Sequence, residues 1–313
     1  MRQRHPRFVA VAGMILTLLV SALAAADPVR VPGTKTSLEP PQGFSPSDRF
    51  PGFQDAETQS SIMVTELPAP GTVMMKGMTK EALASRGMTL ISSTTEKVDG
   101  REALLLHVAQ AAGGTEYLKW MLVTGDEETG VMVVGTFPKT AEAQVGAAIR
   151  TSVLTASRSA ASSGDPFEGL SYRVTPTAKL KLAGRINVML LLSESGRMGP
   201  LPSAEPFYIV GPSVGEVRIA DLKVFSETRA RQTEYKDIQN ISGRAVTVGG
   251  LEAYELVADA KDTKDGTALR FYQVIVPEGD RYYIVQAMVG AERAAELLPE
   301  FRKVTDSLRR VTP

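Results

Sequence analysis

One segment of the sequence has the residue types and spacing of a catalytic nucleophile. Gly211, Ser213 and Gly215 match the Gly-x-Ser-x-Gly pattern of serine hydrolases, and an apolar run from Phe207 to Val210 precedes them. Such an enzyme also needs a histidine base placed after the serine, and no histidine follows Ser213. We therefore expect a turn at this place, with a hydrolase that uses Ser213 and carboxylates as the alternative.

His107 is the one histidine outside the N-terminal segment, and it lies in an apolar run that predicts a β-strand. A lone imidazole in such a run more often packs against neighbours than acts as a base or a ligand. The chain has no cysteine, so a zinc site with several His or Cys ligands is excluded. We predict no catalytic, cofactor-binding or metal-binding residue and no cofactor.

A group of acidic residues near the C-terminus suggests a calcium loop. Asp259, Asp262 and Asp265 precede Gly266 at intervals of three residues. A calcium loop instead places its ligands at alternate positions and ends in a glutamate. The spacing therefore favours a solvated hairpin turn.

Methionines gather in the first half of the chain. Thioethers are soft ligands for Cu(I), but methionine is also an adaptable filler of cores and grooves. We expect the second role, with copper binding as the alternative. The residues are Met63, Met74, Met75, Met78 and Met88.

The first 26 residues have the composition of a secretory signal peptide. Arg2, Arg4 and Arg7 form a positive head, an apolar run extends from Phe8 to Leu23, and small residues follow just before Asp27. We predict cleavage near Asp27, a periplasmic or secreted location, and no stable membrane span afterwards. An uncleaved anchor is the alternative, because the apolar run is near the lower limit for a span.

The composition is that of a globular protein long enough for two domains. Of the 313 residues, 43% are hydrophobic and 22% are charged. The formal net charge is zero, so removal of the three leader arginines leaves 0 − 3 = −3. This balance provides no basic surface for nucleic acid, and we exclude RNA and DNA as partners.

A turn-and-strand pattern occurs twice in the chain. The segments Gly100–Ala103 and Gly250–Ala253 share a Gly-x-Glu-Ala core, and they lie 250 − 100 = 150 residues apart. An apolar run, a Gly-Thr turn and an aromatic-bearing run follow each core. A second turn, another apolar run and a helical pattern come after them. The repeated order predicts a tandem duplication, with the hairpins at Asp99-Gly100 and Gly249-Gly250 in equivalent places.

The predicted boundaries follow from this repeat. The first domain is expected at 34–156, a linker of small polar residues at 155–165, and the second domain at 166–313. We match the apolar run Ile186 to Ser193 with Ile62 to Thr65. This match leaves 195–232 as an insertion in the second domain.

Further equivalences are expected between the two copies. Trp120 and Tyr272 each lie six residues after the glycine of a Gly-Thr turn (120 − 114 = 6 and 272 − 266 = 6), so they should occupy similar places. A helix capped by Thr140 should match a helix from Ala291. In that last helix, Pro299 is expected to cause a kink or a break.

The expected fold class is α+β, with an antiparallel sheet in each of two tandem domains. Short turns join the successive strands, which favours antiparallel pairing. The runs Val131 to Val134 and Tyr282 to Val289 are apolar on both faces, so each sheet should be covered on both sides. We therefore predict helices on both faces of the sheets, as in an α/β/α sandwich, or a second layer supplied by the partner domain.

Several short motifs resemble those of bacterial PsbP-like proteins. They are Gly43-Phe44, Thr65-Glu66-Leu67-Pro68, Arg86-Gly87-Met88, the Val-Asp-Gly hairpin and Lys119-Trp120. The resemblance covers two copies of the domain, and it implies the fold that is shared by an extrinsic photosystem II subunit and a Ran-binding nuclear protein. A photosynthetic role is not implied, because no residue here matches the metal-binding histidine of that subunit.

These features predict an exported, non-catalytic binding or assembly module of the cell envelope with a protein partner. The alternatives are a hydrolase using Ser213 and a carrier of an apolar ligand. The oligomeric state stays open at this level.

Overall fold

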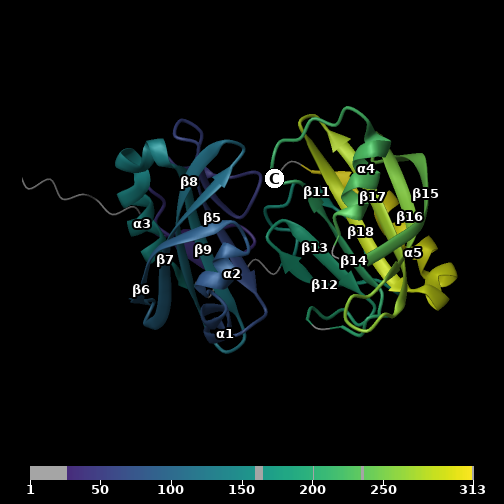
Figure 1. Cartoon of the computed structure of the whole chain (residues 1–313), viewed down its shortest axis with the longest axis horizontal. Helices are drawn as coiled ribbons and strands as arrows, with labels where there is room; N and C mark the ends of the chain where they lie inside the picture. Colours follow the sequence, from purple (N-terminus) through teal and green to yellow (C-terminus); the bar gives the residue numbers. More distant parts are fainter. Residues whose placement is uncertain (1–26, 159–164, 200, 234–235, 312–313) are drawn as a thin grey trace, which may run out of the picture.

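The computed structural model describes residues 27–158, 165–199, 201–233 and 236–311. The predicted signal peptide at 1–26 lies outside the described residues. In the described part of the chain, no helix has the length and apolar content needed to cross a bilayer. The chain forms two α+β domains that lie side by side (Figure 1).

Each domain contains a seven-stranded antiparallel sheet. The first runs in the spatial order β3-β4-β5-β9-β8-β7-β6, and the second in the order β12-β13-β14-β18-β17-β16-β15. The first sheet consists of β3 (Ser45–Pro46), β4 (Gly52–Asp55), β5 (Ser60–Leu67), β6 (Met88–Val98), β7 (Arg101–Ala112), β8 (Thr115–Gly125) and β9 (Gly130–Pro138). The second consists of β12 (Lys181–Ile186), β13 (Met189–Ser193), β14 (Phe207–Pro212), β15 (Lys236–Val248), β16 (Leu251–Lys261), β17 (Ala268–Glu278) and β18 (Arg281–Gly290). The orders are the same, which confirms two tandem domains of one fold.

The register of the strands also repeats. Trp120 lies opposite Gly135, and Tyr272 lies opposite Ala287, so both pairs are related by a shift of 152 residues (272 − 120 and 287 − 135). The predicted equivalence of Trp120 and Tyr272 is therefore confirmed in register. The repeat extends the likeness between the domains from strand order to individual positions.

Both predicted hairpins are present. Asp99 and Gly100 have φ angles of 50° and 76°, and Gly249 and Gly250 have φ angles of 57° and 81°. Positive φ at both central residues is what a two-residue type I′ turn requires, and glycine adopts it without steric cost. These turns set the register of β6 on β7 and of β15 on β16.

The match of Ile186 to Ser193 with Ile62 to Thr65 is wrong. The strand β13 lies second from its edge, as β4 does, whereas β14 pairs with β18 as β5 pairs with β9. The predicted insertion 195–232 is thus corrected, because it includes β14 and a helix that both have counterparts in the first domain. The larger difference is the connection between β13 and β14, which spans 194–206, against 56–59 between β4 and β5.

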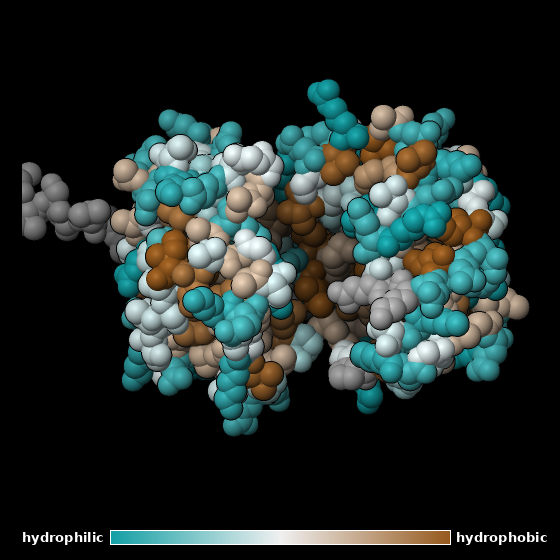
Figure 2. All heavy atoms as spheres, in the orientation of Figure 1, coloured by the Kyte–Doolittle hydropathy of each residue, from teal (hydrophilic) through white to brown (hydrophobic). Residues whose placement is uncertain are grey.

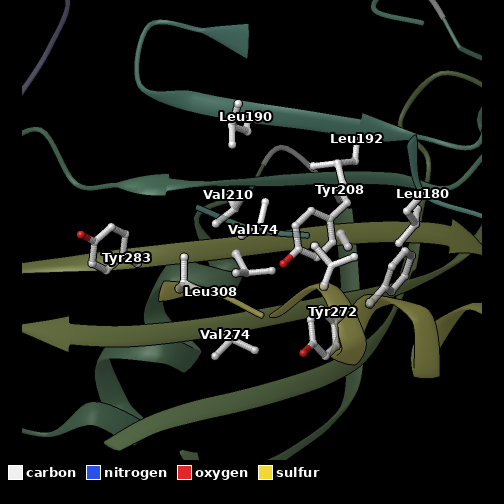
Figure 3. Packing of buried hydrophobic residues seen from close by; sticks show 14 of the residues in the cluster. Val174, Leu180, Leu190, Leu192, Tyr208, Val210, Tyr272, Val274, Tyr283 and Leu308 are labelled. Atoms are coloured by element: carbon white, nitrogen blue, oxygen red, sulfur yellow. The ribbon is translucent and has the colours of Figure 1, made fainter. Parts of the chain in front are cut away.

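Helices cover both faces of each sheet, as predicted. In the first domain, α3 (Ala147–Leu154) packs on one face, and the short helices α1 (Gly71–Lys76) and α2 (Lys80–Ala84) lie on the other. In the second domain, α5 (Ala294–Asp306) and α4 (Leu222–Arg231) take the corresponding faces. Figure 3 shows the core under α5, where β14 contributes Tyr208 and Val210, and β17 contributes Tyr272 and Val274.

Caps explain where some helices begin. Thr79 and Asp221 accept hydrogen bonds from the backbone N–H groups of Ala82 and Val224, and these bonds fix the starts of α2 and α4. The predicted cap at Thr140 is wrong, because the chain there passes through a 3₁₀ turn (Lys139–Ala141) and a π turn (Glu142–Gly146) before α3. A 3₁₀ turn (Ala291–Arg293) also precedes α5, which then continues through Pro299 without a break.

Two small sheets close the domains. The strand β2 (Thr36–Leu38) pairs with β1 (Val29–Arg30) and with β10 (Ser157–Arg158), and β11 (Tyr172–Arg173) pairs with β19 (Arg309–Arg310). Part of the predicted linker 155–165 therefore belongs to the first domain through β10, and 159–164 lie outside the described residues. The first domain also begins with β1, before the predicted boundary at residue 34.

Candidate functional site: a charged cleft between the domains

A cleft of about 580 Å³ lies where the two domains meet. The first domain contributes Asp48, from the connection between β3 and β4. The second domain contributes the turn between β17 and β18, the end of β14, and the segments around β11 and β19. The second-domain residues are Ser171, Pro212, Glu278, Asp280, Arg281, Tyr282, Tyr283, Arg310 and Val311.

Ion pairs join the domains at this cleft. Arg281 lies 3.8 Å from Asp48, and Arg49 lies 4.0 Å from Asp280 and 3.2 Å from Glu216. All of these side chains are partly exposed, and exposed pairs of this kind contribute only about 0–1 kcal/mol each. The charges can therefore exchange their present partners for those of a bound molecule at small cost.

Two tyrosines of β18, Tyr282 and Tyr283, line the cleft. The ring of Tyr283 contacts the buried ring of Tyr172 edge to face, with centroids 5.7 Å apart. Burial raises the pKa of the Tyr283 hydroxyl, so it stays protonated at neutral pH. Beside it, the pKa of Arg310 is raised by its hydrogen bond to Glu278 at 2.7 Å. The cleft therefore offers charged side chains and hydrogen-bond donors to a bound molecule.

Ser213 lies directly after the cleft residue Pro212, but its hydroxyl is engaged by the main chain. Its Oγ donates to the carbonyl of Gly215 at 3.1 Å and accepts from the N–H of Tyr282 at 3.3 Å. The backbone N–H of Ser213 donates to the carbonyl of Tyr282 at 2.7 Å, which continues the β14–β18 pairing. The segment is thus a turn at a strand end, as expected, and His107 lies in the other domain.

His107 on β7 packs against the neighbouring strand. Its ring stacks on Trp120 of β8, with centroids 4.1 Å apart and planes 11° apart, and Arg150 of α3 lies 5.5 Å over the indole. Burial lowers the pKa of His107, and Glu142 opposes this effect weakly. Within the described residues, its buried Nε2 has no hydrogen-bond partner. These contacts are those of a packed imidazole.

The aspartates near the C-terminus point to separate partners. Asp259 binds Arg270 at 2.8 Å, whereas Asp262 and Asp265 accept from nearby backbone N–H groups and so stabilise their own turn. In the part of the chain that the structure describes, no three His, Cys, Asp or Glu side chains are placed to hold a metal ion. The hairpin turn predicted here is present.

The clustered methionines are spread over one face of the first sheet. Met78 and Met88 pack at the rim of a core cluster around Leu83, while Met63 lies on β5. Three strands separate β5 from β6, which carries Met88, so Met63 and Met88 are roughly 19 Å apart at a spacing of 4.8 Å per strand. The five sulfur atoms therefore cannot share one ion.

Sequence patterns did not reveal the cleft. Its charged residues come from turns and strand ends, and Asp48 and Arg281 meet only because the domains are adjacent. One local feature marks this part of the second domain in the sequence. The turn between β17 and β18 carries charges of both signs, in Glu278-Gly279-Asp280-Arg281.

Comparisons with solved structures give distant likenesses. Mycobacterium tuberculosis LpqN, involved in cell envelope biogenesis, is 14% identical, with a TM-score of 0.33, over 45% of this chain and 83% of LpqN. Cyanobacterial PsbP from Synechocystis sp. PCC 6803 is 15% identical, with a TM-score of 0.31, over 47% of this chain and 99% of that protein. The type VI secretion immunity protein TplEi of Pseudomonas aeruginosa is 11% identical, with a TM-score of 0.33, over 90% of this chain and 96% of TplEi.

No family model and no curated protein matches the chain. At the identities and TM-scores of the solved structures, these neighbours identify neither a family nor a function. The resemblance to PsbP-like proteins stays a prediction at the level of the family.

Proposed function

We propose that this chain is a non-catalytic, exported protein-binding module of the cell envelope, and that the cleft between its domains receives part of the partner. The observation that carries the proposal is the cleft itself, with its arginines, tyrosines and acidic side chains. Arginine and tyrosine are enriched among the residues that dominate binding energy in protein interfaces. Mixed charges at a rim favour selective encounter with a complementary surface.

The surface at the domain boundary supports this role. Figure 2 shows apolar side chains along the boundary between the domains, and smaller apolar patches among hydrophilic side chains on the visible face of each domain. A binding site typically combines an apolar centre with a polar rim. The charged residues of the cleft are suited to supply that rim.

Site-specific photo-crosslinking in the producing cells tests the proposal. A photoreactive residue at Asp280 or Val311, both in or beside the cleft, should give one discrete protein adduct. The same residue at Lys261, which is exposed at the end of β16, is the matched control and should not give that adduct. The proposal fails if the cleft positions give no adduct, or if Lys261 gives the same one.

Export is a separate part of the proposal, and it rests on the composition of 1–26. Mass spectrometry of the periplasmic fraction should find a mature chain that begins near Asp27. An intact leader in the membrane fraction would contradict cleavage while leaving the cleft to be judged by the crosslinking.

A further inference from the structure

Strand β6 forms the outer edge of the first sheet, on the side away from the second domain (Figure 1). It pairs with β7 along one side, and among the described residues no strand pairs with its other side. An edge strand leaves a row of backbone N–H and C=O groups unpaired, which is a template for another strand.

The other three edges of the two large sheets have features that oppose such pairing. The strand β3 is two residues long and contains Pro46. The strand β12 has a bulge after Leu182 and contacts β5 of the first domain. The strand β15 has two register irregularities and positive φ angles at Asp237 and Asn240, and the regular stretch 242–248 that follows carries the exposed, charged Arg244 near its midpoint. Short length, proline, bulges and covered edges are the usual means of blocking strand addition.

The strand β6 is more open to pairing. Its one register irregularity falls between Leu90 and Ser92, and from Ser92 to Val98 each residue lies in regular register with β7. The segment Ser92-Ser93-Thr94-Thr95 has no charge, and all four residues are exposed. This edge therefore presents a regular seven-residue stretch whose uncharged part is accessible.

The two charges of this stretch lie near its end and indicate how it can pair with itself. Glu96 is held by Arg150 at 3.4 Å, and Lys97 follows it. Thr95 is the midpoint of the stretch, so two copies overlap fully in antiparallel order when Thr95 faces Thr95 of the partner subunit. A parallel pairing in register would instead set each charge against its own copy, which is unfavourable.

We propose that two copies of this chain pair antiparallel through β6, with a two-fold axis at Thr95. Glu96 then lies opposite Thr94 of the partner subunit and Lys97 opposite Ser93 of the partner subunit, so no like charges face each other directly. Such an interface is self-complementary, as two-fold dimers require. It joins the two first sheets and leaves both clefts at a distance, so it is independent of the proposed partner binding.

Sedimentation equilibrium of the purified protein tests the pairing with a matched pair of variants. Thr95→Lys should raise the dimer dissociation constant at least about tenfold, because it sets two lysines opposite each other. Ala245→Lys is the control, since Ala245 is exposed on the edge strand β15 and pairs with Tyr254 as Thr95 pairs with Leu104. It should leave the constant unchanged.

Cysteine crosslinking gives a second test, because the natural chain has no cysteine. Directly opposed residues have Cβ atoms roughly 4.5–5.5 Å apart, close to the separation in a disulfide. Mild oxidation should therefore link Thr95→Cys into a dimer, while Ser92→Cys and Ala245→Cys stay monomeric on a non-reducing gel.

Three results would overturn the proposal. They are a wild-type protein that is monomeric at all concentrations, a Thr95→Lys variant that associates as the wild type does, and crosslinking at Ala245→Cys equal to that at Thr95→Cys. Circular dichroism checks that the variants are folded. If Thr95→Lys is unfolded, the cysteine series alone decides.

Discussion

The sheet face under the last helix of each domain, α3 in the first and α5 in the second, has different side chains at equivalent register positions. In the second domain, Glu255 accepts from Arg302 of α5 at 2.9 Å and from Arg244 of β15 at 3.0 Å, with its side chain only 6% exposed. In the first domain, the position of Glu255 is taken by the buried Leu105, since Leu105 pairs with Leu122 as Glu255 pairs with Val274. A charged cluster in one copy is an apolar contact in the other.

A second polar group of the second domain has no polar counterpart in the first. The hydroxyls of Tyr208 and Tyr272 lie 3.0 Å and 3.2 Å from Oγ1 of Thr305, which itself donates to the carbonyl of Phe301 at 2.8 Å. At the corresponding positions the first domain has Ile62, Trp120 and Val153 in place of Tyr208, Tyr272 and Thr305. Each of these buried hydroxyls has a hydrogen-bond partner, which offsets much of the cost of burying it.

Strand order and register therefore define this fold more strictly than core composition does. The hairpin turns and the alternation of buried and exposed residues are common to both copies, while the interior side chains have diverged. The predictions below test whether the two interiors act independently.

The largest effect is expected from Phe301→Ala. Phe301 is a fully buried residue of α5, with its ring 5.8 Å from that of Tyr272, so truncation leaves a cavity and costs about 3–5 kcal/mol. Differential scanning calorimetry should show the second domain melting earlier, while the transition of the first domain stays in place. A shift of both transitions together would show that the two copies unfold as one unit.

Glu255→Ala should cost the second domain about 2–3 kcal/mol, because it removes charge-assisted hydrogen bonds from Arg302 and Arg244. Glu255→Leu, which copies the first domain, should cost less, since the added side chain fills the space. Chemical denaturation of both variants measures the two values. Equal costs would show that volume plays no part.

Acid should affect the same cluster. Burial raises the pKa of Glu255, but hydrogen bonds from Arg302 and Arg244 outweigh it, so the folded pKa lies below the ordinary 4.5. The stabilisation that ionised Glu255 contributes is therefore present above pH 4.5 and is lost as the pH falls through its folded-state pKa. Thermal melts from pH 6 to pH 3 should show a smaller acid loss in Glu255→Leu than in the wild type.

Gly100→Val should destabilise the first domain by about 1–2 kcal/mol, because valine resists the φ of 76° that the turn requires. Nothing lies within 4 Å of the added Cβ, so the cost is conformational and not steric crowding. Gly250→Val, at φ 81°, should cost the second domain a similar amount. Unfolding curves that differ strongly between the two variants would contradict the equivalence of the hairpins.

The smallest effect is expected from His107→Val, which copies Val257 of the second domain. It removes a buried, unpartnered Nε2 but also loses the stacking on Trp120, so the net change at pH 8 should stay within about 1 kcal/mol. In the wild type, the lowered pKa of His107 means that stability is lost as the pH falls below the ordinary 6.5. The variant should lack that loss in melts between pH 8 and pH 5.

Local chemistry explains which parts of the fold were predictable from the sequence. The Asp99-Gly100 hairpin and the caps at Thr79 and Asp221 depend on neighbouring residues alone, and the structure contains all three. The cap at Thr140 failed because Thr140 lies inside a 3₁₀ turn, and a π turn follows it before α3 begins. A capping residue indicates a helix start only where the chain before it is free to adopt the cap geometry.

Partners distant in the chain were harder to assign. The runs Ile186 to Ser193 and Phe207 to Val210 are both apolar and follow turns, so periodicity does not tell which one pairs with β18. The cleft was missed for the same reason, since Asp48 and Arg281 come from different domains. The tandem repeat of the two domains was predictable, because it follows from turns that recur along the sequence and does not require knowing which strands pair.

In each small closing sheet, an early strand pairs with a strand that is synthesised much later. The residue Tyr172 pairs with Arg310, 310 − 172 = 138 residues later, and Ser37 pairs with Ser157, 157 − 37 = 120 residues later. At synthesis rates of about 5–20 residues per second, β11 waits roughly 7–28 s for β19 to emerge. Each domain is therefore closed only when its last strand is available, and a chain that stops before β10 or β19 lacks the corresponding closing pair.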